Sequence, residues 1–168
     1  GWATVAKILA PGSRPRDGDK AGRVGTFEYS GDRPAKWRTP EAVWLQGYWC
    51  YDWYDEVIRV GTVDAAARTI TLAAPHIYSL MQGNPSPRRY RALNVLEELD
   101  QPGEFVIDAA AGLLFFWPPD NYALPVTVST LDAPLLALKD ASHITLRGFV
   151  VECGLGDGIE VRGGTNCL

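Results

Sequence analysis

The chain is poor in the residues that build metal centres and disulfide frameworks. Its 168 residues contain three cysteines and two histidines, and no two cysteines stand at Cys-x-x-Cys spacing. Zinc sites need several such ligands close together, so we expect neither a metal nor another cofactor. The odd number of cysteines argues against a disulfide framework. We expect Cys153 and Cys167 to fill apolar positions rather than to bond to each other.

The chain also lacks long apolar runs, and its charge is not uniform in sign. No stretch approaches the roughly 20 apolar residues of a membrane helix, so no membrane partner is expected. The net charge of −4 is uneven, because residues 1–40 carry +4 and residues 41–168 carry −8. The acidic part would repel a phosphate backbone, which excludes nucleic acid as the main partner. A hydrophobic content of 46% is typical of a globular domain.

Aromatic residues concentrate in one stretch, residues 44–56. In an extended strand, three of the six rings would lie on one face and three on the other. Sugar rings stack on Trp and Tyr because their C–H faces are apolar, while nearby carboxylates and amides bind the hydroxyls. The rings are therefore either the core of a small β domain or a saccharide-binding surface. The six candidate substrate-binding residues are Trp44, Tyr48, Trp49, Tyr51, Trp53 and Tyr54.

Two hairpins are predicted from a shared turn pattern. The strand Val57–Val63 ends at Asp64 before a short alanine-rich loop, and the strand returns at Arg68–Leu72. The same pattern recurs at Asp108, before the returning strand 113–117. Each aspartate can accept hydrogen bonds from loop amides, so we expect structural rather than catalytic roles for both.

One helical stretch is predicted, over residues 92–99. Leu93, Leu96 and Leu99 recur at a spacing that puts them on roughly one helix face. The preceding residues, 75–89, read as a long loop that contains His76, a histidine without a visible partner.

Acidic residues crowd around the predicted helix. Glycoside hydrolysis needs a pair of carboxylates that flank the glycosidic bond. The adjacent Glu97 and Glu98 cannot lie on opposite sides of such a bond. A structural role, such as pairing with Arg91, is the favoured interpretation. If the chain were a complete small hydrolase, Glu98 and Asp52 would be the candidate catalytic residues.

The last third of the chain repeats itself at a spacing of 23 residues. Leu136, Leu138 and Ile144 align with Ile159, Val161 and Cys167, so apolar residues meet apolar residues. Short apolar strands separated by Gly or Asn turns at such a period are typical of a parallel β-helix. Each turn of a solenoid must stack on a neighbour to bury its inner face.

Two segments resemble known proteins. Residues 142–149, followed by 158–161, resemble the opening coils of right-handed parallel β-helix proteins of the pectate-lyase-like superfamily. Residues 94–105, continued by 107–108 and 114–119, resemble a segment of large bacterial β-helix proteins, many of them glycoside hydrolases.

The resemblance implies a parent protein that binds or cleaves polysaccharide or oligosaccharide outside the cytoplasm, either secreted or periplasmic. It also implies that the catalytic carboxylates lie on later coils, which a chain ending at Leu168 would lack. The sequence shows no signal peptide, and a start at Gly1 fits a cleaved leader. Hydrolysis and elimination both remain open.

We therefore predict an all-β chain with two parts. Residues 1–130 would form a small region of hairpins, resembling a sandwich, with one short helix, and residues 131–168 the first coils of a right-handed parallel β-helix. The leading hypothesis is part of a carbohydrate-active β-helix enzyme. The alternatives are a non-catalytic module that caps a β-solenoid and a complete small hydrolase. An open β-helix end would favour a homo-oligomer.

Overall fold

A computed structural model describes residues 1–83, 86–120, 122–123 and 125–168. The chain forms two compact units, Gly1–Asp120 and Asn121–Leu168. The boundary expected at residue 130 therefore falls within the second unit. The prediction of an all-β chain is confirmed, because the described residues contain ten strands and no α-helix.

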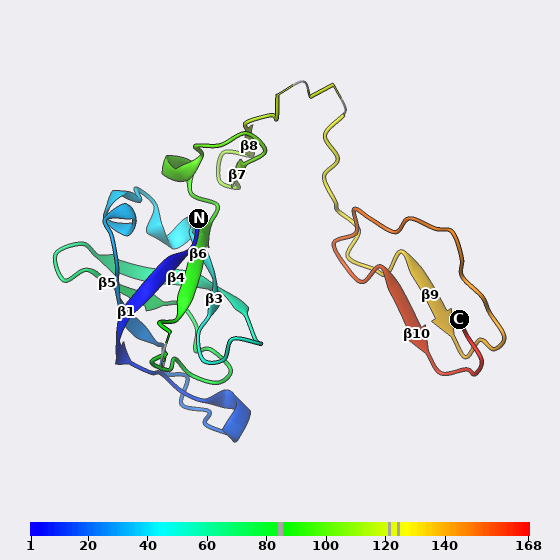
Figure 1. The fold of residues 1–168 in the computed structure, drawn as a ribbon, viewed down its shortest axis with the longest axis horizontal. Coiled ribbons are helices and arrows are strands. Elements are labelled where there is room, and N and C mark those ends of the chain that lie inside the picture. Colours follow the sequence, from blue (N-terminus) through cyan, green and yellow to red (C-terminus); the bar gives the residue numbers. More distant parts are fainter. Residues whose placement is uncertain (84–85, 121, 124) are drawn as a thin grey trace. The chain divides into compact units, whose positions relative to one another are not determined.

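The first unit is built around six strands that close into a barrel in the order β1-β2-β5-β4-β3-β6. All neighbours pair antiparallel, and β6 returns to pair with β1 (Figure 1). The strands are β1 (Ala3–Ala10), β2 (Thr26–Tyr29), β3 (Trp44–Tyr48), β4 (Glu56–Asp64), β5 (Thr69–Leu72) and β6 (Arg89–Leu93). Register shifts in the β1–β2 and β4–β5 pairs add the local twist that barrel closure requires.

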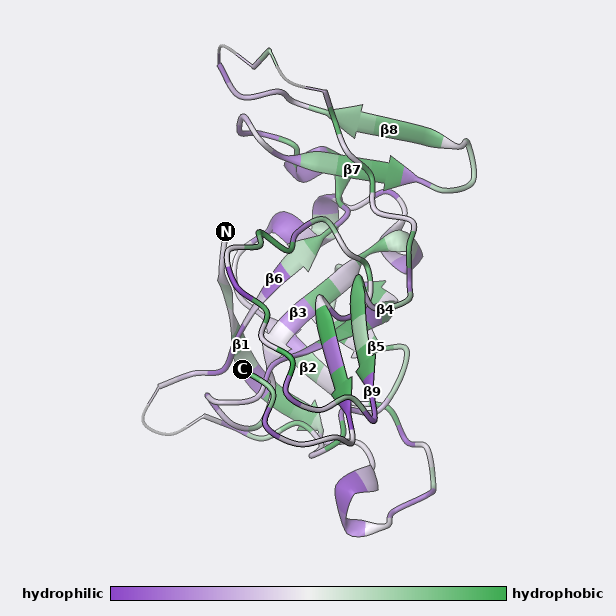
Figure 2. Ribbon diagram, turned by 90° about the vertical axis from the view of Figure 1, so that its right-hand side faces the viewer, coloured by the Kyte–Doolittle hydropathy of each residue, from purple (hydrophilic) through white to green (hydrophobic). Residues whose placement is uncertain are grey.

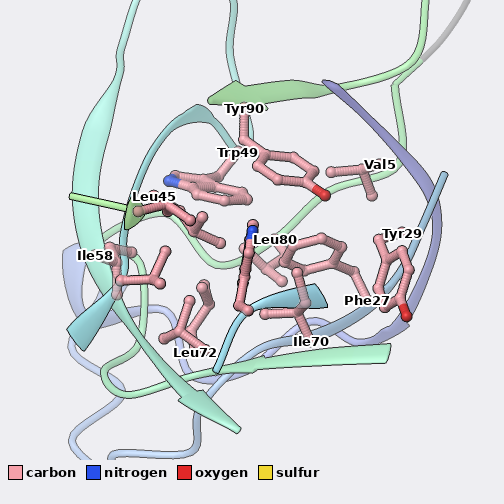
Figure 3. Packing of buried hydrophobic residues seen from close by; sticks show 14 residues of the cluster. Val5, Phe27, Tyr29, Leu45, Trp49, Ile58, Ile70, Leu72, Leu80 and Tyr90 are labelled. Atoms are coloured by element: carbon pink, nitrogen blue, oxygen red, sulfur yellow. The ribbon is translucent and has the colours of Figure 1, made fainter. Parts of the chain in front are cut away.

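Side chains alternate between the barrel interior and the solvent. In β3, Leu45 and Gly47 are buried, while Trp44, Gln46 and Tyr48 point outward. Inward residues from all six strands form one core, together with residues of the connecting segments (Figure 3). The core consists of Val5, Phe27, Tyr29, Trp37, Val43, Leu45, Trp49, Ile58, Val60, Ile70, Leu72, Leu80, Tyr90 and Val95.

The predicted sandwich-like arrangement of this region is wrong, because the six strands close into a barrel through β6. The predicted loop ends at residue 89 and the predicted helix begins at residue 92, so both overlap this strand. In the structure β6 pairs with β1 on one side and with β3 on the other, which closes the ring. Residues 84 and 85 of the predicted loop lie outside the described residues.

The predicted helix over 92–99 is also wrong. Strand β6 continues through Leu93, and Asn94 then adopts a left-handed conformation with φ of 62°. Only one 3-10 turn follows, η4 (Leu96–Glu98). The Asn94 side chain accepts from the amide of Ile107 at 2.7 Å and donates to its carbonyl at 3.0 Å. This exchange fixes the end of the barrel to the next hairpin.

Both predicted hairpins are confirmed. Strand β4 turns into β5, and the Asp64 carboxylate accepts from the Ala67 amide at 2.8 Å. Strand β7 (Phe105–Asp108) turns into β8 (Leu113–Phe116), and Asp108 accepts from Ala111 at 2.9 Å. Figure 2 shows that β8 is hydrophobic along its length.

Three more 3-10 turns connect the barrel strands: η1 (Pro15–Asp17), η2 (Arg33–Lys36) and η3 (Pro40–Ala42). No helix among the described residues is long and apolar enough to cross a membrane.

The second unit contains the parallel pairing that the repeat predicts. Strands β9 (Leu136–Lys139) and β10 (Ile159–Arg162) align with Leu136 opposite Ile159, a shift of 23 residues. The alignment continues at a bridge between Ser142 and Thr165. These described residues make a two-stranded parallel sheet and not a complete parallel β-helix.

The three cysteines are free thiols. Cys167 is half-buried, but Cys153 is exposed, so the expectation that it fills an apolar position is wrong. Cys50 is buried in the barrel unit, and burial raises the pKa of its thiol.

Candidate functional site

The structure divides the six predicted aromatic residues into three groups. Strand β3 ends at Tyr48, so the expected long strand with rings on both faces does not form. Trp49 is 1% exposed and belongs to the core, where an external ligand cannot reach it. Trp44 and Tyr48 lie on the outer face of β3. The remaining three rings lie in the segment between β3 and β4.

These three rings meet two further rings from the segment after β5. Tyr51 and Trp53 stack with their planes 12° apart and their centroids 5.3 Å apart. Tyr78 meets Tyr51, Trp53 and Tyr54 edge to face, at 5.3, 5.9 and 5.2 Å. His76 lies behind, 5.8 Å from Tyr54. We call Tyr51, Trp53, Tyr54, His76 and Tyr78 the loop cluster.

Trp53 is the exposed member of the loop cluster. Its side chain is 70% exposed, although one ring face is covered by Tyr51 and its edge contacts come from Tyr54 and Tyr78. An indole fixed by neighbouring rings but open to solvent can receive an apolar ring face without losing much conformational freedom. The cluster therefore presents a preformed stacking surface.

Polar contacts fix the segment that carries these rings. The Arg14 guanidinium donates to the Tyr51 hydroxyl at 3.3 Å. The Asp52 carboxylate lies 3.2 Å from both Arg88 and Arg89. Because Arg88 is almost buried, this ion pair joins the segment to the start of β6.

His76 supports the loop cluster from inside. The side chain is buried at 1% exposure, and Nδ1 lies 2.9 Å from the Ser79 carbonyl oxygen, to which it can donate. Nε2 lies 3.3 Å from a Glu56 carboxylate oxygen, without hydrogen-bond geometry. Burial lowers the pKa of His76 below its ordinary value of 6.5, against the opposing effects of Ser79 and Glu56.

We expect the barrel to become less stable at acidic pH because the proton that His76 takes up favours the unfolded chain. A depressed pKa means that the unfolded chain binds the proton more tightly than the folded chain. The free energy of unfolding should therefore fall as pH drops below 6.5, and His76→Gln should flatten that slope. Urea titrations at pH 7.5, 6.5 and 5.5 measure the slope of the unfolding free energy against pH. His143→Gln, on the exposed histidine of the second unit, is the control; equal slopes in both variants would contradict the assignment.

The two candidate catalytic carboxylates are bound by different basic side chains. Asp52 is held by Arg88 and Arg89, as described above. Glu98 forms an ion pair with Arg33 and accepts from the Trp37 indole at 2.8 Å. The two carboxylates share no partner, because Asp52 is bound by Arg88 and Arg89 whereas Glu98 is bound by Arg33 and Trp37.

Glu98 also lines a cleft, but the cleft has structural contacts rather than free functional groups. Its volume is about 350 Å³, and Arg33, Asn94 and Phe105 line it beside Glu98. The acidic partner of Arg33 is Glu98 itself, and Asn94 is used by its bonds to Ile107. The neighbouring Glu97 pairs with Arg38 at 2.6 Å and not with Arg91, and this contact lowers the pKa of Glu97.

Sequence reasoning missed three residues of the site. Tyr78 and His76 lie in the stretch predicted as a long loop, and Arg14 lies in the basic segment of residues 1–40, to which no site was assigned. The signal that could have found two of them is the pair of aromatic rings Tyr78 and His76, which stand two residues apart in a segment that otherwise resembles a loop.

No protein family model, curated protein or solved structure matches this chain. The described residues also contain no group of three or more His, Cys, Asp or Glu side chains placed to hold a metal ion.

Proposed function

We propose that this chain is a glycan-binding part of a carbohydrate-active protein and that the barrel binds oligosaccharide through the loop cluster. The observation that carries the proposal is Trp53, an indole held by three tyrosines and still 70% exposed. Sugar C–H faces stack on such rings, and the neighbouring Asp52 offers an acceptor for hydroxyl groups.

The second unit supports the wider part of the proposal, that the parent is a β-helix protein of the pectate-lyase-like type acting outside the cytoplasm. Besides β9 and β10, the two turns are joined by backbone bonds from His143 to Thr165 at 2.9 Å and from Leu168 to Ile144 at 2.9 Å. Pairing in three successive segments at one spacing is how coils of a parallel solenoid stack. In this proposal the second unit contributes the first coils of a right-handed helix.

A second candidate is a non-catalytic interaction module. It is favoured by Ile159 and Val161 of β10, which are 46% and 54% exposed. Among the described residues, no strand pairs with the outer edge of β10. An apolar edge of this kind can pair with another strand, including one from a second copy of the chain.

The test of glycan binding is the substitution Trp53→Ala. A glycan array identifies the neutral oligosaccharides that bind the 168-residue chain, and calorimetry then measures their Kd. We expect roughly tenfold weaker binding for the variant, because it loses the stacking surface. The matched control is Trp117→Ala, which removes another exposed indole, 45% exposed, next to β8.

Equal losses in both variants would contradict a site at the loop cluster. Light scattering on the same samples separates the two candidates. Binding by a monomer supports the glycan-binding proposal, whereas no binding together with a stable oligomer supports the interaction module.

A further inference from the structure

A second surface of the barrel carries aromatic rings together with arginines whose charge is only partly neutralised. Strands β4, β3, β6 and β1 are neighbours in the barrel (Figure 1). The surface lies on the outer side of β4, β3 and β6, next to the start of β1. The register places Trp44 opposite Arg59 of β4 and Leu93 of β6, and Gln46 opposite Arg91. We call the following residues the basic face: Trp2, Trp44, Gln46, Tyr48, Arg59, Arg89 and Arg91.

The rings and guanidinium groups of the basic face are ordered by stacking. Trp2 and Tyr48 lie 5.7 Å apart between centroids. The Arg89 guanidinium lies over Tyr48 at 4.3 Å and over Trp2 at 5.7 Å, and Arg91 lies over Trp2 at 5.5 Å. Arginines stacked on rings keep their edges free to bind anions and are already oriented to do so.

The positive charge of this surface is only partly balanced. Arg89 shares Asp52 with Arg88, and Arg91 donates to the neutral Gln46 side chain at 2.7 Å. In the part of the chain that the structure describes, no carboxylate lies within ion-pair distance of Arg91 or Arg59. The exposed arginines therefore form a local positive surface on a chain whose net charge is −4.

We propose that the basic face binds a negatively charged saccharide, one whose rings carry carboxylate or sulfate groups. A planar guanidinium binds such oxygens through two parallel hydrogen bonds, and Trp44 and Trp2 offer surfaces on which the sugar rings stack. The Gln46 side chain accepts a hydrogen bond from Arg91 and donates one to Asp55, so its amide orients the arginine.

This inference goes beyond the proposed function, because it names the charge of the ligand and a different surface from the loop cluster. A saccharide is favoured over a single-stranded nucleic acid. A long phosphate backbone would extend beyond the local arginines and meet the net negative charge of the chain, whereas a short charged oligosaccharide contacts only those arginines.

The test uses hexasaccharides of uronic acids, the same hexasaccharides after reduction of their carboxyl groups to alcohols, sulfated neutral hexasaccharides and a hexathymidylate. Calorimetry with the 168-residue chain should show binding of the uronates or the sulfated sugars that weakens with salt. The carboxyl-reduced sugars should bind at least tenfold more weakly than the uronates at the basic face. Arg91→Gln should weaken binding of the charged sugar about tenfold, since it removes a charged hydrogen-bond donor.

The control is Lys20→Gln, which removes the same charge from an exposed residue that does not belong to the basic face. Equal loss in both variants would mean a general charge effect and would overturn the site. Preference for hexathymidylate would overturn the saccharide assignment. If charged sugars fail to bind while Trp53-dependent binding of neutral sugars persists, this inference fails and the proposed function stands.

Discussion

Replacing Trp49 with alanine is expected to lower the free energy of unfolding of the barrel by about 3–5 kcal/mol, the usual cost of deleting a buried aromatic side chain. The Trp49 ring stacks on Tyr90 with centroids 5.9 Å apart and packs 5.6 Å from Phe27 (Figure 3). Its indole donates to the Glu56 carbonyl at 2.9 Å. The ring also fills the space that Gly47 leaves, where a Cβ would overlap it.

Urea unfolding followed by far-UV circular dichroism measures this loss without relying on tryptophan fluorescence. Trp53→Ala is the matched control, because it deletes the same side chain from a largely exposed position. Surface substitutions usually change stability by at most about 0.5 kcal/mol. A Trp49 variant as stable as the Trp53 variant would show that the ring does not organise the core.

Local chemistry made part of this fold predictable. The turns at Asp64 and Asp108 follow from a carboxylate that accepts a loop amide three residues later, an interaction contained within one short segment. The register of β9 and β10 follows from the 23-residue repeat, because stacked turns bring equivalent residues together.

Barrel closure was not predictable in the same way. Strand β6 is short, and its last residue, Leu93, begins the Leu93, Leu96 and Leu99 spacing that also fits a helix. What makes it a strand is pairing with β1 and β3, which begin 86 and 45 positions earlier in the chain. Tertiary pairing overrides local preference where segments are short, and single-sequence periodicity carries no information about it.

The candidate site was likewise predictable only in part. The density of rings in residues 44–56 points to a stretch that supplies three rings of the loop cluster, but it cannot separate core from surface. Trp49 and Trp53 are four residues apart, yet one is buried and the other largely exposed, because β3 ends at Tyr48 and the chain leaves the sheet. The partners His76 and Tyr78 come from a distant segment and are brought in only by the fold.

The parallel turns of the second unit yield the other large expected effect, from the substitution Gly164→Ala. Gly164 has φ of +77°, and an added Cβ would overlap the carbonyl oxygen of Ala141 in the adjacent turn. Because the contacted atom is backbone, one turn must move away from the other. We expect loss of the bonds that join the turns, including Asp140 to Arg162 at 2.7 Å.

Gly148→Ala separates this displacement from simple backbone strain. Gly148 has nearly the same φ, +76°, but an added Cβ there meets nothing within 4 Å. It should cost only about 1–2 kcal/mol for a left-handed alanine. Amide hydrogen exchange at Asp140 and His143, whose amides donate across the turns, reports the difference. Exchange should be at least tenfold faster in Gly164→Ala than in Gly148→Ala, because only the first substitution separates the turns; equal rates would mean that the close approach at Ala141 does not hold the turns in register.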